Sequence, residues 1–132
     1  DAVAEEIHSL GREALAVTTD VASKASVQEM VAQIIDRFGH VDTLGNNAGV
    51  GGTSAIPKIT EELWDLNIAV NLKGVFLCTQ PVFTHMCDRG SGHIVNVTSL
   101  ADRKDGANFR AYAAAKWGAR RRPRPRAAPR RA

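Results

Sequence analysis

The feature that most constrains the fold is an alternation of short apolar segments with longer amphipathic ones along the 132 residues. Three short segments rich in β-branched residues predict strands, over residues 14–19, 41–46 and 94–98. Apolar residues at helical spacing predict helices over residues 1–10, 23–38 and 60–86, with another from near Asn108. Such alternation predicts an α/β fold with a parallel sheet, because parallel neighbours need a long crossover connection.

Residue types at the predicted helix ends support these boundaries. Ser23 can cap the second helix with its hydroxyl, and Gly39 is a suitable stop. Thr60 precedes two glutamates, and carboxylates are favoured at a helix amino terminus. Pro81 lies inside the long helical region and predicts a kink or a break there.

Tyr112 and Lys116 are four residues apart, so a helix would present both side chains on one face. A phenol ordinarily titrates near about pH 10. A lysine cation beside it favours the phenolate, which makes a usable acid/base near neutral pH. Ser99 lies at the carboxyl end of the predicted strand 94–98, where open α/β sheets place their ligands. Each alone has a simpler interpretation: a solvated lysine beside a half-buried tyrosine, and a serine that caps a strand.

Three polar motifs precede these residues. Asp20-Val21 follows the first predicted strand, Asn46-Asn47-Ala48-Gly49 follows the second, and Asn71 lies in the long helical region. Simpler interpretations exist for each: a helix cap, a turn that tolerates positive φ, and an asparagine bonded to its own backbone. As an ordered set the motifs favour one shared site.

In this order, the motifs closely resemble those of the short-chain dehydrogenase/reductase family, and the chain looks most similar to its 3-oxoacyl-carrier-protein reductase-like branch. The resemblance covers residues 1–118. It implies a partial NAD(P)-binding domain with a Rossmann-type doubly wound parallel sheet, in which the first two and the last strands of the family fold are missing. The strands at 41–46 and 94–98 would then be neighbours. No G-x-x-x-G-x-G precedes the predicted strand at 14–19, so the resemblance lacks the turn that holds the pyrophosphate.

The resemblance implies reversible hydride transfer between NAD or NADP and a carbonyl or alcohol substrate. Tyr112 would act as the acid/base, with Lys116 supporting it and binding the nicotinamide ribose. Ser99 would bond the substrate oxygen, and Asn71 would hold a water that links Lys116 to solvent. The implied cofactor-binding residues are Asp20, Val21, Asn47, Ala48, Gly49, Tyr112 and Lys116.

The last thirteen residues depart from the family pattern. They hold seven arginines, and their prolines exclude a helix interior, so we expect residues 119–132 to form a disordered tail. The abrupt change suggests a shifted reading frame, and one alternative is therefore a noncatalytic, truncated or frame-shifted remnant. Another is a basic-tailed nucleic-acid-binding fragment, which is less favoured because the tail has no aromatic residue to stack on bases. Without the glycine-rich turn, we expect the oxidoreductase activity of this chain alone to be impaired.

Composition narrows the remaining classes. No apolar run approaches the roughly 20 residues that cross a bilayer, and the acidic start is not typical of a signal peptide. Cys78 and Cys87 lack metal-ligand spacing, so we expect no metal site and two free, buried thiols in a cytoplasmic protein. The resemblance implies a homotetramer or homodimer, assembled through helices at residues 66–85 and after Tyr112, and a small-molecule substrate.

Overall fold

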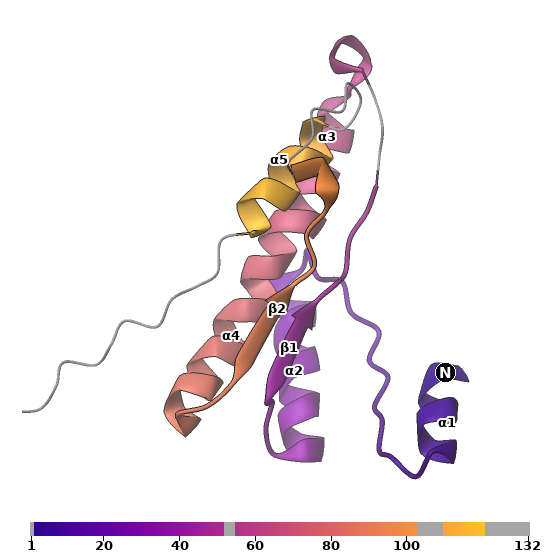
Figure 1. Cartoon of the computed structure of the whole chain (residues 1–132), viewed down its shortest axis with the longest axis vertical. Coiled ribbons are helices and arrows are strands. Elements are labelled where there is room, and N and C mark those ends of the chain that lie inside the picture. Colours follow the sequence, from indigo (N-terminus) through magenta and orange to yellow (C-terminus); the bar gives the residue numbers. More distant parts are fainter. Residues whose placement is uncertain (1, 52–54, 103–109, 121–132) are drawn as a thin grey trace, which may run out of the picture.

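The computed structural model describes residues 2–51, 55–102 and 110–120. Figure 1 shows the path of the chain through these parts. The main elements, in chain order, are α1 (Ala2–Ser9), α2 (Lys24–Phe38), β1 (Thr43–Asn46), α3 (Glu61–Ile68), the π-helix η2 (Ala69–Lys73), α4 (Gly74–Arg89), β2 (His93–Asn96) and α5 (Arg110–Ala119). Two short 3-10 turns complete the list, η1 (Ile56–Lys58) and η3 (Leu100–Asp102).

β1 and β2 form a two-stranded parallel sheet, in the register Thr43 to His93 through Asn46 to Asn96. The connection between them is the helical run α3–η2–α4, as a parallel pair requires. The predicted pairing of the strands at 41–46 and 94–98 is confirmed, with both strands shorter than expected.

The predicted strand at 14–19 is wrong. Residues 12–20 are neither helix nor strand, and β1 and β2 pair only with each other in the described parts of the chain. An extended segment becomes a strand only when a neighbour supplies its ladder of backbone hydrogen bonds. The β-branched pattern of this segment reports a preference for extended backbone, which the structure does not convert into a sheet.

α2 has the boundaries that its capping residues predict. The Ser23 hydroxyl accepts a hydrogen bond from the Ser26 amide, and the helix ends at Gly39 with φ of 77°. Only glycine adopts that left-handed conformation without strain from a Cβ atom. Thr60 likewise caps α3 by accepting from the Leu63 amide, as predicted.

The long helical region departs from α geometry at Ala69–Lys73, a π-helical turn, whereas α4 continues through Pro81 to Arg89. The helix is therefore not broken at Pro81. Asn71 lies in the π-helical turn, and its buried carboxamide bonds the backbone of Val50 in another segment. A π-turn widens the helix by one residue, a local distortion that frequently accompanies functional sites.

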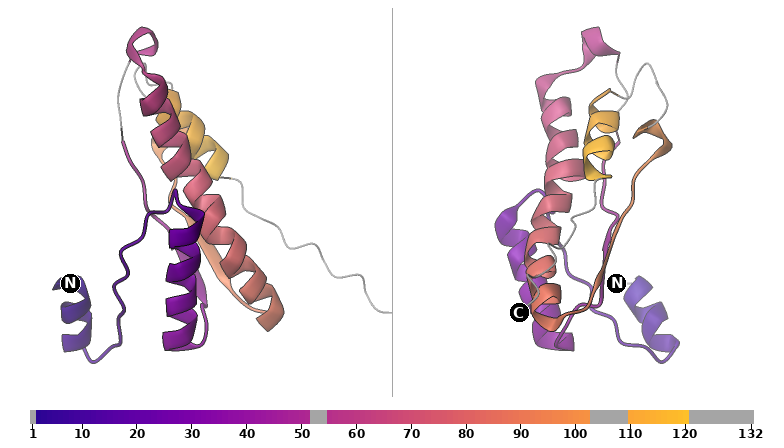
Figure 2. Two further views of the ribbon diagram at one scale, coloured as in Figure 1. Left: turned by 180° about the vertical axis from the view of Figure 1, so that it is seen from behind. Right: turned by 60° about the vertical axis from the view of Figure 1, so that its left-hand side comes forward.

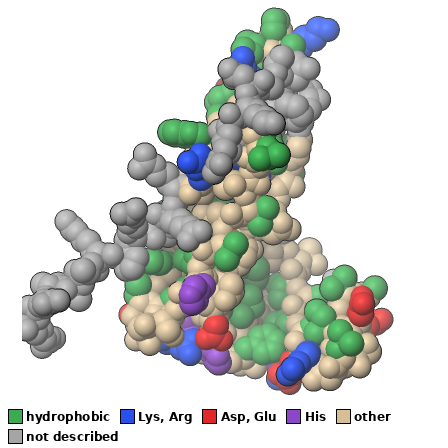
Figure 3. Space-filling view, in the orientation of Figure 1, with side chains coloured by type: hydrophobic (Ala, Val, Ile, Leu, Met, Phe, Trp, Pro, Cys, Tyr) green, Lys and Arg blue, Asp and Glu red, His purple; other side chains and the backbone are tan. Residues whose placement is uncertain are grey.

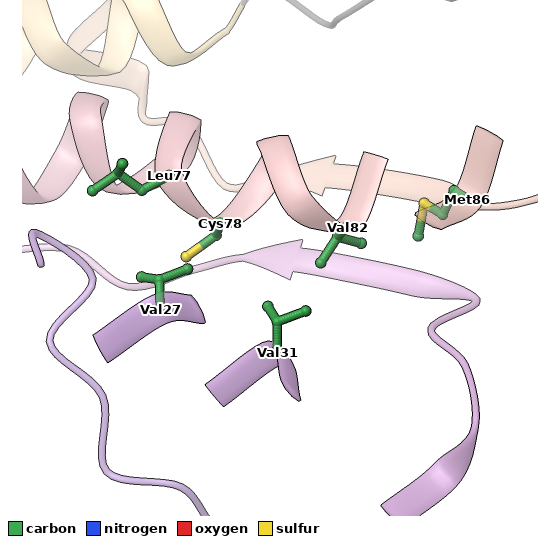
Figure 4. Close-up of a cluster of buried hydrophobic side chains, with 6 residues drawn as sticks. All are labelled: Val27, Val31, Leu77, Cys78, Val82 and Met86. Carbon is green, nitrogen blue, oxygen red and sulfur yellow. The ribbon is translucent and has the colours of Figure 1, made fainter. Parts of the chain in front are cut away.

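The core lies where α2 and α4 meet on one face of the sheet (Figure 4). Its buried members are Val27, Val31, Leu77, Cys78, Val82 and Met86. Burial raises the pKa of the Cys78 thiol. Both cysteines are free, as expected, but Cys87, in the last turn of α4, is exposed rather than buried.

Two surfaces remain open beside this core. α1 stands apart from the rest of the described chain, joined to it by the extended segment 12–20, and it has no buried residue (Figure 2). Figure 3 shows it as a separate protrusion with apolar and acidic side chains. On the face of the sheet opposite α4, Val95 and Val97 are exposed. None of the helices in the described ranges is both long and apolar enough to cross a membrane.

The core makes a direct stability prediction. Val27→Ala removes two methyl groups from a site that is 1% exposed, and we expect a loss of about 2 kcal/mol in the free energy of unfolding. The matched control, Val3→Ala on α1, changes a side chain that is 64% exposed and should leave stability unchanged. Urea unfolding followed by circular dichroism measures both. Equal unfolding midpoints for the two variants would contradict this placement of the core.

Candidate functional site

Lys116 is the central side chain of the candidate site. It lies on α5 and is only 5% exposed, and its Nζ donates a hydrogen bond of 3.0 Å to the carbonyl oxygen of Val97. The same Nζ lies 5.7 Å from the ring centroid of Tyr112. The predicted i, i+4 pairing of the two side chains is thus present on one face of the helix. A buried ammonium requires such partners, because desolvation without them costs several kcal/mol.

Asn71 is fully buried and holds the turn that follows β1. Its Oδ1 accepts a hydrogen bond from the Val50 amide at 3.2 Å, and its Nδ2 donates to the Val50 carbonyl at 2.9 Å. The carboxamide therefore pairs with both polar groups of one main-chain residue, much as a neighbouring strand would. This pair of bonds joins the π-helical turn to the loop after β1.

The side chains of Asn71 and Lys116 both lie against Gly49. A Cβ atom on Gly49 would lie 2.8 Å from Asn71 Oδ1 and 3.4 Å from Lys116 Nζ. The two polar groups thus converge on one point of the loop, and any larger side chain there would have to displace Asn71. Absence of a side chain, rather than an unusual φ, is what the site needs at this glycine.

A second polar network aligns the carboxyl ends of the strands. Asn46 Nδ2 donates to Thr79 Oγ1 at 3.1 Å and to Asn96 Oδ1 at 2.9 Å. Asn96 Nδ2 in turn donates to the carbonyl oxygen of Ala119, the last residue of α5. The network ties β1, β2, α4 and α5 together, and so fixes where α5 carries Lys116 relative to Val97.

Ser99 and Tyr112 lie near the same end of the sheet. Ser99 follows β2 by three residues, is partly buried, and its Oγ accepts a hydrogen bond from the Ala101 amide at 3.2 Å. The short turn η3 that begins at Leu100 packs against α5, which carries the partly buried Tyr112 (Figure 1). Ser99 therefore immediately precedes the turn that packs against the helix of Tyr112 and Lys116.

The remaining predicted residues divide into two groups. Asn47 and Ala48 are exposed on the loop after β1, next to Gly49. Asp20 is exposed and its carboxylate accepts from the Ala22 amide, so it shapes the turn before α2, whose cap is Ser23. Val21 packs against Gly74 of α4 and joins the edge of the core. Both residues are thus placed at the start of α2 and at the edge of the core.

Three participants were not predicted from the sequence. Val50 and Val97 act through main-chain groups, which carry no sequence signal. Asn67 is 0% exposed and accepts a hydrogen bond from Asn71 through its side chain. The signal that could have identified it is a second asparagine four residues before Asn71, on the same helical face.

Comparison with known proteins identifies the family. The sequence model of the short chain dehydrogenase family matches residues 1–122. The chain is 44% identical over 117 residues to the (2S)-[(R)-hydroxy(phenyl)methyl]succinyl-CoA dehydrogenase subunit BbsD of Thauera aromatica, covering 89% of this chain and 47% of that protein. It is 39% identical over 118 residues to the 3-oxoacyl-[acyl-carrier-protein] reductase FabG of Staphylococcus epidermidis, covering 89% and 48%. The chain thus spans about half the length of these relatives.

Solved structures agree in fold. A metagenomic short-chain oxidoreductase in complex with NADP has a TM-score of 0.84 at 34% identity, covering 89% of this chain and 54% of that one. A short-chain alcohol dehydrogenase from Sinorhizobium meliloti 1021, described as putative, also has a TM-score of 0.84, at 32% identity, covering 89% and 46%. The expected fold class, a partial Rossmann-type doubly wound parallel sheet, is confirmed. With the match over residues 1–122, these findings establish that the chain belongs to the short-chain dehydrogenase family of oxidoreductases.

Proposed function

We propose that this chain carries the proton-transfer half of an NAD(P)-dependent carbonyl or alcohol oxidoreductase site. The observation that supports this most directly is Lys116, held by Val97 beneath the ring of Tyr112 at the carboxyl end of two parallel strands. Ligands of open α/β sheets bind outside this end. Tyr112, Lys116, Ser99 and Asn71 are the proposed catalytic residues.

Each side chain has a distinct role in the proposed reaction. The Tyr112 hydroxyl donates its proton to the carbonyl oxygen in reduction and accepts one in oxidation. The Lys116 cation lies beside the ring of that tyrosine and would attract the negative charge that develops on its oxygen as the proton leaves. Ser99 donates a hydrogen bond to the substrate oxygen and so fixes its position. Asn71 is the proposed anchor of a water that links Lys116 to solvent.

The residues present fit one end of a nicotinamide cofactor, which would supply the hydride. An ammonium carries three donor hydrogens, and the bond to Val97 uses one of them, so Lys116 can also bind ribose hydroxyls. The exposed Asn47, Ala48 and Gly49 would line the same end. Asp20 and Val21 are the proposed contacts of the adenine. The NADP complex of the metagenomic relative supports a cofactor of this type, and both NAD and NADP remain candidates.

The described residues offer a poorer binding site for the pyrophosphate of the cofactor than for its nicotinamide end. In the described ranges, no helix opens on a glycine-rich turn, the structure that ordinarily holds this group. We therefore propose that residues 1–118 form a partial cofactor-binding domain with weakened affinity. The two free thiols fit a reducing compartment, so we propose a cytoplasmic location.

The first test is a calorimetric titration of the chain with NADH and then with NADPH. We expect saturable, weak binding of at least one cofactor, and a further loss of about tenfold in affinity in Lys116→Ala, because the proposed hydrogen bond from its ammonium to the ribose is lost. Lys58→Ala is the matched control, since Lys58 is exposed on η1. Absence of binding to the wild-type chain would contradict the proposal and favour the noncatalytic remnant.

Tyr112→Phe separates chemistry from binding. The variant keeps the ring that packs beside Lys116 and removes only the hydroxyl. We expect the rate of carbonyl reduction by NADH or NADPH to fall by about 100-fold or more, with cofactor affinity unchanged. Absorbance of the reduced nicotinamide measures the rate, and calorimetry measures the affinity. A variant that retains the wild-type rate would exclude Tyr112 as the acid/base.

We also propose that a second copy of this chain packs on the outer face of α4. An apolar groove of about 370 Å³ lies where this face meets the π-helical turn and α5, lined by residues that include Leu72, Val75, Phe76, Phe83 and Gly118. Phe76 is 56% exposed, although it is one of the largest apolar side chains of α4. Exposed apolar grooves of this kind typically mark interfaces. This face lies on the helical region, residues 66–85, through which the family resemblance implies assembly into a homodimer or homotetramer.

Phe76→Glu tests the proposed interface. A charge in the middle of the groove would have to be desolvated on association, so we expect the variant to sediment as a monomer at concentrations where the wild-type chain is a dimer or tetramer. Val95→Glu is the control, because Val95 is exposed on the sheet face instead. Analytical ultracentrifugation measures the oligomeric state of the wild-type chain and of both variants. A wild-type chain that is monomeric at all concentrations would contradict this assembly.

A further inference from the structure

Asn67 and Asn71 form a buried pair of carboxamides. Both are 0% exposed and lie four residues apart, at the junction of α3 with the π-helical turn. Asn71 Nδ2 donates to Asn67 Oδ1 at 3.2 Å, and Asn67 Nδ2 donates to the carbonyl oxygen of Leu63 at 2.9 Å. Burying an amide without hydrogen-bond partners destabilises the folded state, and both carboxamides avoid this cost by bonding to each other and to the backbone.

The hydrogen bonds at the two ends of the pair allow only one orientation of each carboxamide. The Leu63 carbonyl can only accept, which directs Nδ2 of Asn67 toward it and leaves Oδ1 facing Asn71. The Val50 carbonyl can only accept and its amide can only donate, which assigns Nδ2 and Oδ1 of Asn71 in the same way. Both hydrogens of Asn71 Nδ2 are therefore used, one by Val50 and one by Asn67.

This orientation matters beside Lys116. Asn71 Oδ1 and Lys116 Nζ both lie next to the position that a Cβ atom on Gly49 would occupy, at 2.8 Å and 3.4 Å. A flipped Asn71 carboxamide would turn its N–H groups toward the Val50 amide and toward the ammonium side of the site. It would replace an attraction with a repulsion between donors. Asn67 opposes the flip, because its Oδ1 accepts only from the amide nitrogen of Asn71.

We propose that Asn67 is a positioning residue, which locks the Asn71 carboxamide and thereby holds the loop at residues 49–50 against Lys116. Its link to cofactor binding rests on the function proposed above. Asn67 itself does not contact the reacting groups; it acts through Asn71.

The test compares two variants of nearly equal shape. Asn67→Thr keeps a hydroxyl that can donate to the Leu63 carbonyl, four residues back, and accept from Asn71. Asn67→Val has the same branching with neither donor nor acceptor. Amide hydrogen exchange, measured by NMR on the full 132-residue chain, follows the Val50 amide that bonds Asn71. The amides of Val27 and Leu77, in the core, serve as internal references.

We expect the Val50 amide to exchange about fivefold faster in Asn67→Val than in Asn67→Thr, with the two core amides unchanged, because one hydrogen bond of ordinary net strength is lost locally. Equal exchange at Val50 in the two variants would overturn the proposal. So would faster exchange by one common factor at Val50, Val27 and Leu77, which would make Asn67 a contributor to global stability only.

Cofactor titration of the same variants separates this inference from the proposed function. We expect Asn67→Val to bind NADH or NADPH several-fold more weakly than Asn67→Thr, since the loop that would line the cofactor is loosened. If the wild-type chain binds neither, the proposed function fails, and the exchange comparison still upholds or overturns the role of Asn67. If both variants bind equally while their Val50 exchange differs, the proposed link between Asn67 and the cofactor site is overturned.

Discussion

The hydrogen bond from Lys116 to the Val97 carbonyl is the interaction on which the candidate site depends. A buried ammonium is tolerated only where acceptors surround it, and the described chain places this one against a main-chain oxygen just beyond β2. That oxygen is in place because Val97 continues the parallel ladder, donating its own amide to the Asn46 carbonyl. The position of the lysine therefore depends on the pairing of two strands that are fifty residues apart in the sequence.

Polar side chains, together with the buried alanines of α5, align α5 and the strands with the rest of the described chain. The apolar core joins α2 to α4 at one end, whereas asparagines join the strands, the loop after β1 and α5 at the other. Such amide networks have strict donor and acceptor requirements, so they specify one geometry where apolar packing would allow several. The π-helical turn at Ala69–Lys73 is part of this network, because it contains Asn71, which bonds to the backbone of Val50.

The sequence predicted helix ends well, because a helix end depends on interactions between residues that are close in the sequence. Ser23, Gly39 and Thr60 end or begin helices through hydrogen bonds and dihedral angles within a few residues, and these boundaries are confirmed. The segment 14–19 and Pro81 show the opposite case. A strand needs a partner elsewhere in the chain, and a helix that is packed along its length tolerates a proline that would interrupt an isolated one.

The sequence by itself determined the family, through an ordered set of motifs, and the i, i+4 relation of Tyr112 to Lys116, because helical spacing is a property of the backbone. Only the tertiary structure decided what surrounds that lysine. The carbonyl of Val97, the loop at Gly49 and the buried Asn67–Asn71 pair come from segments that the fold brings together. Main-chain acceptors have no side-chain signature, and a buried asparagine is recognisable as functional only once its hydrogen-bond partners are known.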